Sequence, residues 1–355
     1  MFRRMKLNKN IFFVVVICIA YVASREVAGD AKLLADTDYI KNLGFLDIGW
    51  RTLVTIKTNI LGNTDIANII YIYMIQLVGL IAIYNTANKT NNKLLTALLL
   101  TTLLVPIAIR IQLRLGFSIS LWLFSVTDYW VNKKMNRFLL TSIFASSMHQ
   151  GIAVVNAIVL FNVFSNKLNL NIIRIRLPKK LKILYFAFIL ILSLGLSTEF
   201  MPLAINIFTA LSDKVGNLLP TISTLSSVVN KSDSFYREGT FKLLSILYTL
   251  TLLVLAYFAN SYRERYLGMA YSKEVSTYKL YSIFSRIFII TAFFNIVFSG
   301  LEYFGRIGTL CYPIYALIII FVDIGKGTNE KGIRNINHLY YTIPSIMGAV
   351  RFLES

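Results

Sequence analysis

Charged side chains beside long apolar segments are the first candidates for chemistry in this sequence. Arg110 and Arg114 stand four residues apart between two apolar segments, on one helical face if the helix continues. Arginine keeps its charge and presents a planar fork of N–H donors that matches phosphate oxygens. The pair therefore suits a pyrophosphate group. The simpler alternative is that both side chains reach toward lipid phosphates at a membrane surface.

His149 is a second candidate, because it lies in a small polar group within the apolar stretch 138–164. Imidazole titrates near neutral pH, so His149 could accept a proton or bind a sugar hydroxyl. A structural histidine with satisfied hydrogen bonds is the open alternative. Asp38 and Asp47 are carboxylates of the segment 24–65. Either could act as a proton acceptor or belong to a solvated loop.

The remaining chemical signals are few. Arg306 follows Glu302 by four residues, so a local ion pair would explain it as well as ligand binding would. The chain has 2 histidines and 2 cysteines, Cys18 and Cys311, without metal-ligand spacing. A nucleotide-binding loop of the Walker type is also missing from the sequence. We therefore expect neither a metal nor a cofactor.

The elements that must position these residues are membrane helices. Of 355 residues, 56% are hydrophobic and 15% are charged, whereas a soluble domain has about 25% charged residues. Apolar runs recur along the whole chain, so we expect an all-α polytopic integral membrane protein with about 8–10 transmembrane helices in a single domain, 1–355. The stretch 338–353 is either an interfacial helix or a short crossing. The expected spans are 11–28, 66–84, 94–112, 114–131, 183–200, 242–260, 281–300 and 307–323.

The stretch 138–164 is expected to be a helical hairpin around His149. Basic residues flank it on both sides, and a single crossing would place one basic cluster outside. A hairpin keeps both clusters in the cytoplasm, together with the N-terminus and the segments 85–93 and 132–137. It leaves two long periplasmic loops, about 24–65 and 200–241, and the turn near 110–114 outside. The first loop could hold an amphipathic helix with Trp50 at the level of the lipid head groups. The net charge of +19 then reflects topology rather than nucleic-acid binding.

The order of these features resembles the Wzy-type O-antigen and exopolysaccharide polymerases, especially their EpsG-like subgroup. The likeness covers roughly 30–325. The segments that carry it are Asp47-Ile48-Gly49-Trp50 after Asp38-Tyr39, the segment that opens at Arg114, the apolar run 138–153 with His149, and Glu302-Tyr303-Phe304-Gly305-Arg306.

This resemblance implies a glycosyltransferase of the bacterial inner membrane that acts at the periplasmic face. It would join oligosaccharide repeat units carried on undecaprenyl pyrophosphate, with His149 and Asp47 as catalytic residues. The pyrophosphate and glycan would be bound by Arg110, Gln112, Arg114, Arg306, Asp38 and Tyr39. Membrane lipids and a chain-length regulator are further candidate partners. The alternatives are a lipid-linked oligosaccharide flippase or transporter, and another lipid-carrier-dependent transferase or ligase.

Overall fold

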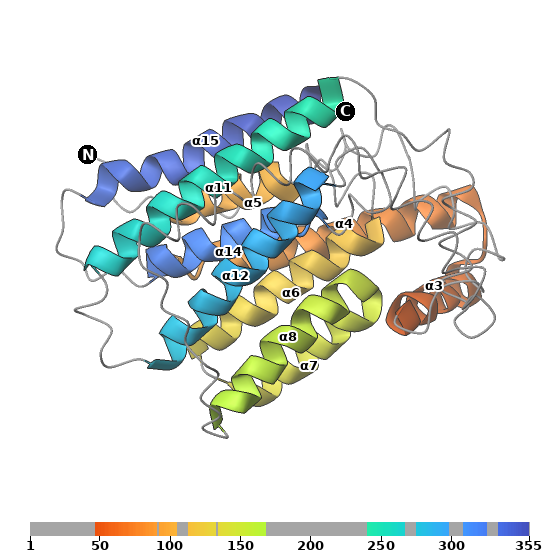
Figure 1. Ribbon diagram of the computed structural model, residues 1–355. Coiled ribbons are helices and arrows are strands. Elements are labelled where there is room, and N and C mark those ends of the chain that lie inside the picture. The colour runs from red at the N-terminus through yellow and green to blue at the C-terminus, as the bar shows by residue number, and fades with distance from the viewer. Residues whose placement is uncertain are drawn as a thin grey trace, which may run out of the picture. The chain divides into compact units, whose positions relative to one another are not determined.

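The described part of the protein is entirely helical. The computed structural model describes residues 47–90, 92–104, 113–132, 134–167, 240–266, 275–297, 308–324 and 333–354. Within these ranges there are ten helices and no strands (Figure 1). The helices are α3 (Ile48–Leu61), α4 (Asp65–Ala87), α5 (Lys93–Leu104), α6 (Leu113–Asn132), α7 (Met135–Met148), α8 (Gln150–Lys167), α11 (Thr240–Tyr266), α12 (Val275–Val297), α14 (Cys311–Ile324) and α15 (Ile333–Glu354). The all-α class is therefore confirmed for these residues.

Helices occupy the positions of most expected spans. The predictions for 66–84 and 114–131 correspond to α4 and α6, and α5 covers the first part of 94–112. The expected spans after residue 240 correspond to α11, α12 and α14, and α15 contains the stretch 338–353. The spans 11–28 and 183–200 lie outside the described residues. Among the described helices, α4, with 23 residues, is the one both long enough and apolar enough to cross a membrane.

The chain divides into two compact units. The first comprises Met1–Ser165, Leu255–Ser285 and Tyr312–Ser355, and the second comprises Asn166–Val254 and Arg286–Cys311. Within the second unit, Asn295 Nδ2 of α12 donates a hydrogen bond to Thr249 Oγ1 of α11 at 2.6 Å. All residues of the candidate site described below belong to the first unit.

α6 and α7 pack against each other through small, hydroxylated side chains. Ser118 Oγ donates to the carbonyl of Ala145 at 2.5 Å, and Ser125 Oγ donates to the carbonyl of Phe138 at 3.1 Å. Residue numbers therefore rise along α6 where they fall along α7, which makes the pair antiparallel (Figure 1). Small residues at such contacts allow close approach of the helix axes, and side-chain hydrogen bonds link the two helices.

α7 and α8 form the helical hairpin expected around His149. His149 separates the two helices with an extended backbone, at φ −155° and ψ 126°. Asn156 Nδ2 of α8 donates to the carbonyl of Ser142 at 3.2 Å and to Ser146 Oγ at 2.9 Å, both on α7. In one continuous helix, Asn156 and Ser142 would stand about 21 Å apart. The chain therefore reverses at His149, and the hairpin is confirmed.

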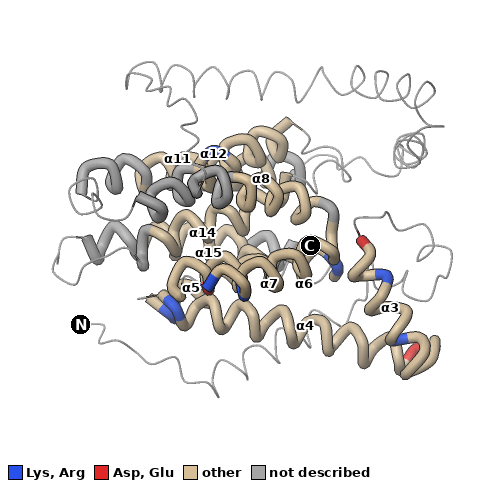
Figure 2. The backbone as a smooth tube through the Cα atoms, turned by 90° about the horizontal axis from the view of Figure 1, so that it is seen from below, with Lys and Arg blue, Asp and Glu red and all other residues tan. Residues whose placement is uncertain are grey.

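The helices expose many large apolar residues and bury several polar ones. α4 carries a continuous exposed stripe of large apolar side chains: Ile66, Ile69, Ile70, Tyr73, Met74, Leu77, Val78 and Ile81. Asn68, Gln76 and Thr86 of the same helix are buried. Every charged residue of α4, α5, α6 and α7 stands within five residues of a helix end. Figure 2 accordingly shows the tube of α4 free of charge between its ends.

A buried lysine ties α3 to the start of α4. Lys57 is 3% exposed, and its Nζ donates to Asn63 Oδ1 at 3.1 Å and to Asn68 Oδ1 at 2.5 Å. Between the two helices, Gly62 has φ 79°, and Thr64 caps α4 by accepting a hydrogen bond from the amide of Ala67. Desolvation of the ammonium lowers the pKa of Lys57 from its usual 10.5.

The free energy of unfolding should rise with pH through this lysine. The pKa of Lys57 is lower in the folded protein than the 10.5 of an exposed lysine. The unfolded chain therefore binds more protons between these two values, and the native state gains stability as the pH rises toward 10.5. We expect the rise to be smaller in Lys57→Met than in the wild type. Unfolding titrations in detergent at several pH values would measure it, and identical pH profiles would contradict the assignment.

Candidate functional site

Asp47 and Arg114 form an ion pair although 67 residues separate them in the sequence. Arg114 Nη1 lies 2.9 Å from Asp47 Oδ2, and the two side chains are 12% and 4% exposed. Asp47 precedes α3 but makes no capping hydrogen bond to it. Arg114 lies in the first turn of α6, where the helix dipole disfavours a cation. The two side chains therefore pair with each other instead of stabilising the ends of their own helices.

A hydrophobic cluster that includes Leu113, the residue before Arg114, brings the segments together. Its buried members are Trp50, Val54, Tyr71, Ile72, Ile75, Leu113, Phe117 and Met148, from α3, α4, α6 and α7. The rings of Trp50 and Tyr71 lie 5.8 Å apart. Trp50 is fully buried, so the expectation that it lies at the level of lipid head groups is wrong. The amphipathic helix itself is present as α3, and Trp50 is its anchor to the protein.

The hairpin tip reaches the same end of the bundle. Gly49 of α3 lies so close to Ser147 that an added Cβ would overlap the serine Oγ and would come within 2.9 Å of Met148 Cε. Asp47 and His149 each stand two residues from this contact. Leu113, the neighbour of Arg114, shares the hydrophobic cluster with Met148, the neighbour of His149. Three residues selected from distant parts of the sequence thus flank one cluster.

His149 caps the second helix of the hairpin. The amide of Gly151 donates to His149 Nδ1 at 3.0 Å, and the carbonyl of His149 accepts hydrogen bonds from the amides of Ile152 and Ala153. This is the arrangement of an N-cap residue, with a side-chain acceptor for one of the first amides of the helix. In neutral imidazole an accepting Nδ1 leaves the proton on Nε2. In its neutral form, His149 therefore carries an N–H donor rather than a proton acceptor at Nε2.

Two substitutions separate the capping role of His149 from a chemical role. His149→Ala removes the cap and should lower the free energy of unfolding by about 1 kcal/mol. Asparagine is a favourable N-cap residue, so His149→Asn should keep the stability of the wild type and lose only the imidazole. Thermal unfolding and activity would be measured on both variants. Full activity in a stable His149→Asn protein would leave His149 with the structural role alone.

The arrangement offers a carboxylate, a guanidinium and an imidazole N–H at one end of the helices. An ionised carboxylate can accept a proton, and a guanidinium with further N–H donors can stabilise negative charge on phosphate oxygens. Among the described residues, no group of three or more His, Cys, Asp or Glu side chains could hold a metal ion. The other candidates from the sequence lie outside the described residues: Asp38, Tyr39, Arg110, Gln112 and Arg306.

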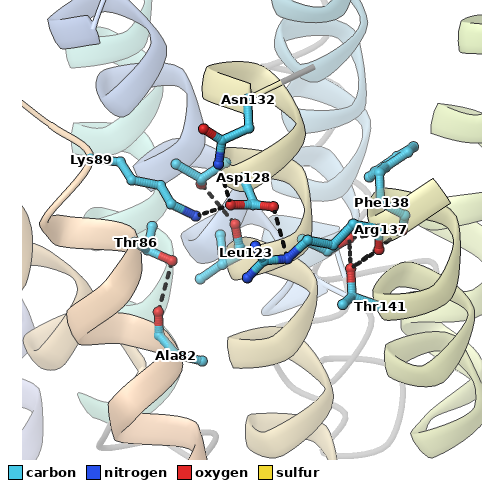
Figure 3. A network of polar contacts seen from close by, with 11 residues as sticks. Ala82, Thr86, Lys89, Leu123, Asp128, Asn132, Arg137, Phe138 and Thr141 are labelled. Atoms are coloured by element: carbon cyan, nitrogen blue, oxygen red, sulfur yellow. Dashed lines mark hydrogen bonds and ion pairs between the residues drawn. The ribbon is translucent and has the colours of Figure 1, made fainter. Parts of the chain in front are cut away.

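A second polar network, which sequence reasoning missed, lies at the opposite end of α6. Asp128 is almost fully buried and lies 2.8 Å from Lys89 Nζ, 3.2 Å from Arg137 Nε and 2.7 Å from Asn132 Nδ2 (Figure 3). Lys89 also lies over the ring of Phe124, at 4.2 Å from its centroid. A carboxylate within an apolar run is costly unless a cation pairs with it. Asp128 in the sequence could therefore have predicted a nearby lysine or arginine partner.

The two networks stand about 21 Å apart along α6, since 14 residues separate Arg114 from Asp128. Lys89 follows α4 and Arg137 lies in the first turn of α7, so the second network joins three neighbouring helices at that end.

Comparisons of this chain with models of known protein families, with curated proteins and with solved structures give no match.

Proposed function

We propose that this chain is a polytopic protein of the bacterial inner membrane. The exposed apolar faces support this, because water-soluble monomers rarely expose contiguous apolar stripes of this size. Besides α4, exposed large apolar residues occur on α7, α8, α11 and α12, among them Leu140, Phe161, Phe258 and Ile290. In a membrane, lipid would cover such faces, so they would not carry the free-energy cost of apolar surface in water. The buried serine, threonine and asparagine side chains form hydrogen bonds inside the protein.

The two polar networks support the orientation proposed from the charge pattern. The segments 85–93 and 132–137 are both expected in the cytoplasm, and Lys89 and Arg137 meet at Asp128. The loop 24–65 and the turn near 110–114 are both expected outside, and Asp47 meets Arg114. Each network thus joins segments assigned to the same side. On this proposal the Asp47–Arg114 end faces the periplasm and the N-terminus is cytoplasmic.

We further propose that the protein joins undecaprenyl-pyrophosphate-linked oligosaccharide repeat units into O-antigen or exopolysaccharide at the periplasmic face. One observation carries this proposal: the partly buried ion pair of Asp47 and Arg114 beside the hairpin tip that bears His149. Glycosyl transfer from a pyrophosphate needs a proton acceptor for the incoming hydroxyl and positive charge for the leaving group. The pair supplies both within one site.

In the proposed reaction, the oxygen of an acceptor sugar hydroxyl forms a bond to the anomeric carbon of the donor glycan. The bond from that carbon to the pyrophosphate oxygen breaks, and undecaprenyl pyrophosphate leaves with the electron pair. The Asp47 carboxylate accepts the hydroxyl proton, and the Arg114 guanidinium moves toward the phosphate oxygens as their charge develops. His149 Nε2–H would donate to an oxygen of the same group. Apolar helix faces would hold the polyprenyl chains.

The test uses the purified full-length protein with one undecaprenyl-pyrophosphate-linked repeat unit in detergent or lipid nanodiscs. We expect a ladder of products on a gel, and we expect deletion of the gene to reduce the surface polysaccharide to a single repeat. Asp47→Asn should abolish the ladder at unchanged protein level. Transfer of the repeat to a different acceptor would indicate a ligase, and loss of even the single repeat in the deletion strain would indicate a flippase or an earlier step.

A further inference from the structure

The network around Asp128 holds one positive charge more than its carboxylate balances. Lys89 Nζ lies 2.8 Å from one carboxylate oxygen, and Arg137 Nε lies 3.2 Å from the other (Figure 3). The side chain of Lys89 is 16% exposed, whereas that of Arg137 is 52% exposed. Lys89 and Asp128 therefore balance each other largely inside the protein, and the charge of Arg137 remains at the surface.

Asp128 and Phe124 orient the guanidinium of Arg137. Its Nε faces the carboxylate, and its central carbon lies 5.4 Å from the centroid of the Phe124 ring. A contact through Nε leaves the N–H donors of both Nη groups for another acceptor. Phosphate oxygens match this planar fork, and a fork that is already oriented loses less side-chain entropy on binding.

The segments that meet at this network are basic. The segments 85–93 and 132–137 contain no acidic residue, and their cations are Lys89, Lys93, Lys133, Lys134 and Arg137. In the proposed orientation both segments face the cytoplasm, at the level of the inner head groups. A group of cations at this level attracts anionic head groups more strongly than zwitterionic ones.

An apolar face continues from Arg137 along α7. Leu140 and Phe144 follow Arg137 by three and seven residues, which places all three on one side of the helix. Both apolar side chains are exposed. Phe144 stands about 10 Å further along the helix than Arg137. A cation followed by an apolar face matches the order of a phospholipid, in which the acyl chains lead away from the phosphate. A soluble phosphate compound would leave this face without a partner.

We propose that the cytoplasmic end of α7 binds an anionic phospholipid, with the phosphate at the Nη groups of Arg137 and an acyl chain along Leu140 and Phe144. Asp128 is a positioning residue in this site, since it orients the guanidinium, and Lys89 balances its charge. The inference rests on the proposed membrane location and not on glycosyl transfer.

The test measures binding of phosphatidylglycerol to the delipidated full-length protein in detergent, with phosphatidylcholine for comparison. Native mass spectrometry gives the affinity for each lipid. We expect the wild type to prefer phosphatidylglycerol, and Arg137→Gln to bind it about tenfold more weakly, as expected for loss of one charge-assisted hydrogen bond. Equal affinity of the wild type for the two lipids, or wild-type affinity in Arg137→Gln, would overturn the proposal.

Arg286→Gln is the matched control, because it removes an exposed arginine from α12 and changes the net charge by the same amount. It should keep the wild-type affinity. Equal weakening in both variants would mean that net charge, rather than a site, attracts the lipid. If Arg137→Gln fails to fold, Arg137→Lys keeps a cation beside Asp128 without the planar fork. Weaker binding by this variant would support the site, and wild-type affinity would overturn it.

Glycerol 3-phosphate distinguishes a lipid from a soluble phosphate ligand, because it carries the phosphate without acyl chains. It should not displace phosphatidylglycerol from the wild type at equal concentration. Displacement would overturn the assignment to a lipid and would indicate a soluble phosphate compound. A preference for phosphatidylglycerol in a protein that makes no ladder would support this inference while the proposed polymerase function fails. A ladder without that preference would overturn the inference alone.

Discussion

An Arg114→Ala variant is expected to make polymer at least about a hundredfold more slowly than the wild type at equal protein level. Loss of one preorganised group that stabilises developing negative charge commonly costs a factor of about 100–1,000 in rate. The substitution also leaves the Asp47 carboxylate, 4% exposed, without this cation. Arg114→Lys keeps the charge but not the planar fork, so an intermediate rate is expected. The rate of ladder formation by purified protein measures each effect.

Arg137→Ala is the matched control for this experiment. It removes an arginine that also forms an ion pair with a buried carboxylate, Asp128, but at the opposite end of α6. We expect this variant to retain polymer synthesis once its protein level is matched to the wild type. Equal losses in Arg114→Ala and Arg137→Ala would show that the Arg114 effect is structural. Full-length polymer from Arg114→Ala at normal protein level would rule out its role at the pyrophosphate.

An Asp128→Asn variant is expected to lose about 2–3 kcal/mol of unfolding free energy. Removing one partner of a buried ion pair typically costs about 3–5 kcal/mol, and the partial exposure of Lys89 and Arg137 reduces this figure. The variant leaves two cations facing each other at the base of the hairpin. Denaturant titration in detergent micelles measures the loss. Because Arg114 is about 21 Å away along α6, the Michaelis constant of the folded variant should remain unchanged.

The double variant with Lys89→Gln tests whether the loss comes from the ion pair. Removing both charges of the pair should cost less than the sum of the two single substitutions, by about 1 kcal/mol or more. Additive losses would mean that Lys89 and Asp128 do not stabilise the fold through each other. Asn132→Ala should have a smaller effect than Asp128→Asn, since the amide of Asn132 donates only one hydrogen bond to the carboxylate.

Much of the helical framework follows from the sequence because it depends on local signals. The apolar run at 66–84 has the length and composition of a helix, and α4 exceeds it by only one residue at the start and three at the end. The hairpin follows from a polar interruption and from the basic residues on both sides of it, and the chain reverses at His149. In each case the information lies within one continuous stretch of the sequence.

The candidate site is less predictable because it depends on which helices meet. Asp47 and Arg114 are each chosen from the sequence, but for separate roles, and nothing local to either residue indicates that they pair across 67 positions. Trp50 is assigned to the membrane surface because interfacial tryptophans are common, whereas it packs against Tyr71.

The exposed apolar faces and buried polar contacts of these helices have a consequence for how such a chain would diverge. On the membrane proposal, positions such as Ile70, Met74 and Leu77 face acyl chains, where one large apolar residue serves as well as another. These positions can drift freely between lineages. The polar positions that hold helices together, such as Ser118 and Asn156, can change only together with their partners. Sequence identity between distant relatives would then persist at a few scattered polar positions. At the apolar positions, which make up most of an alignment, it would be lost quickly.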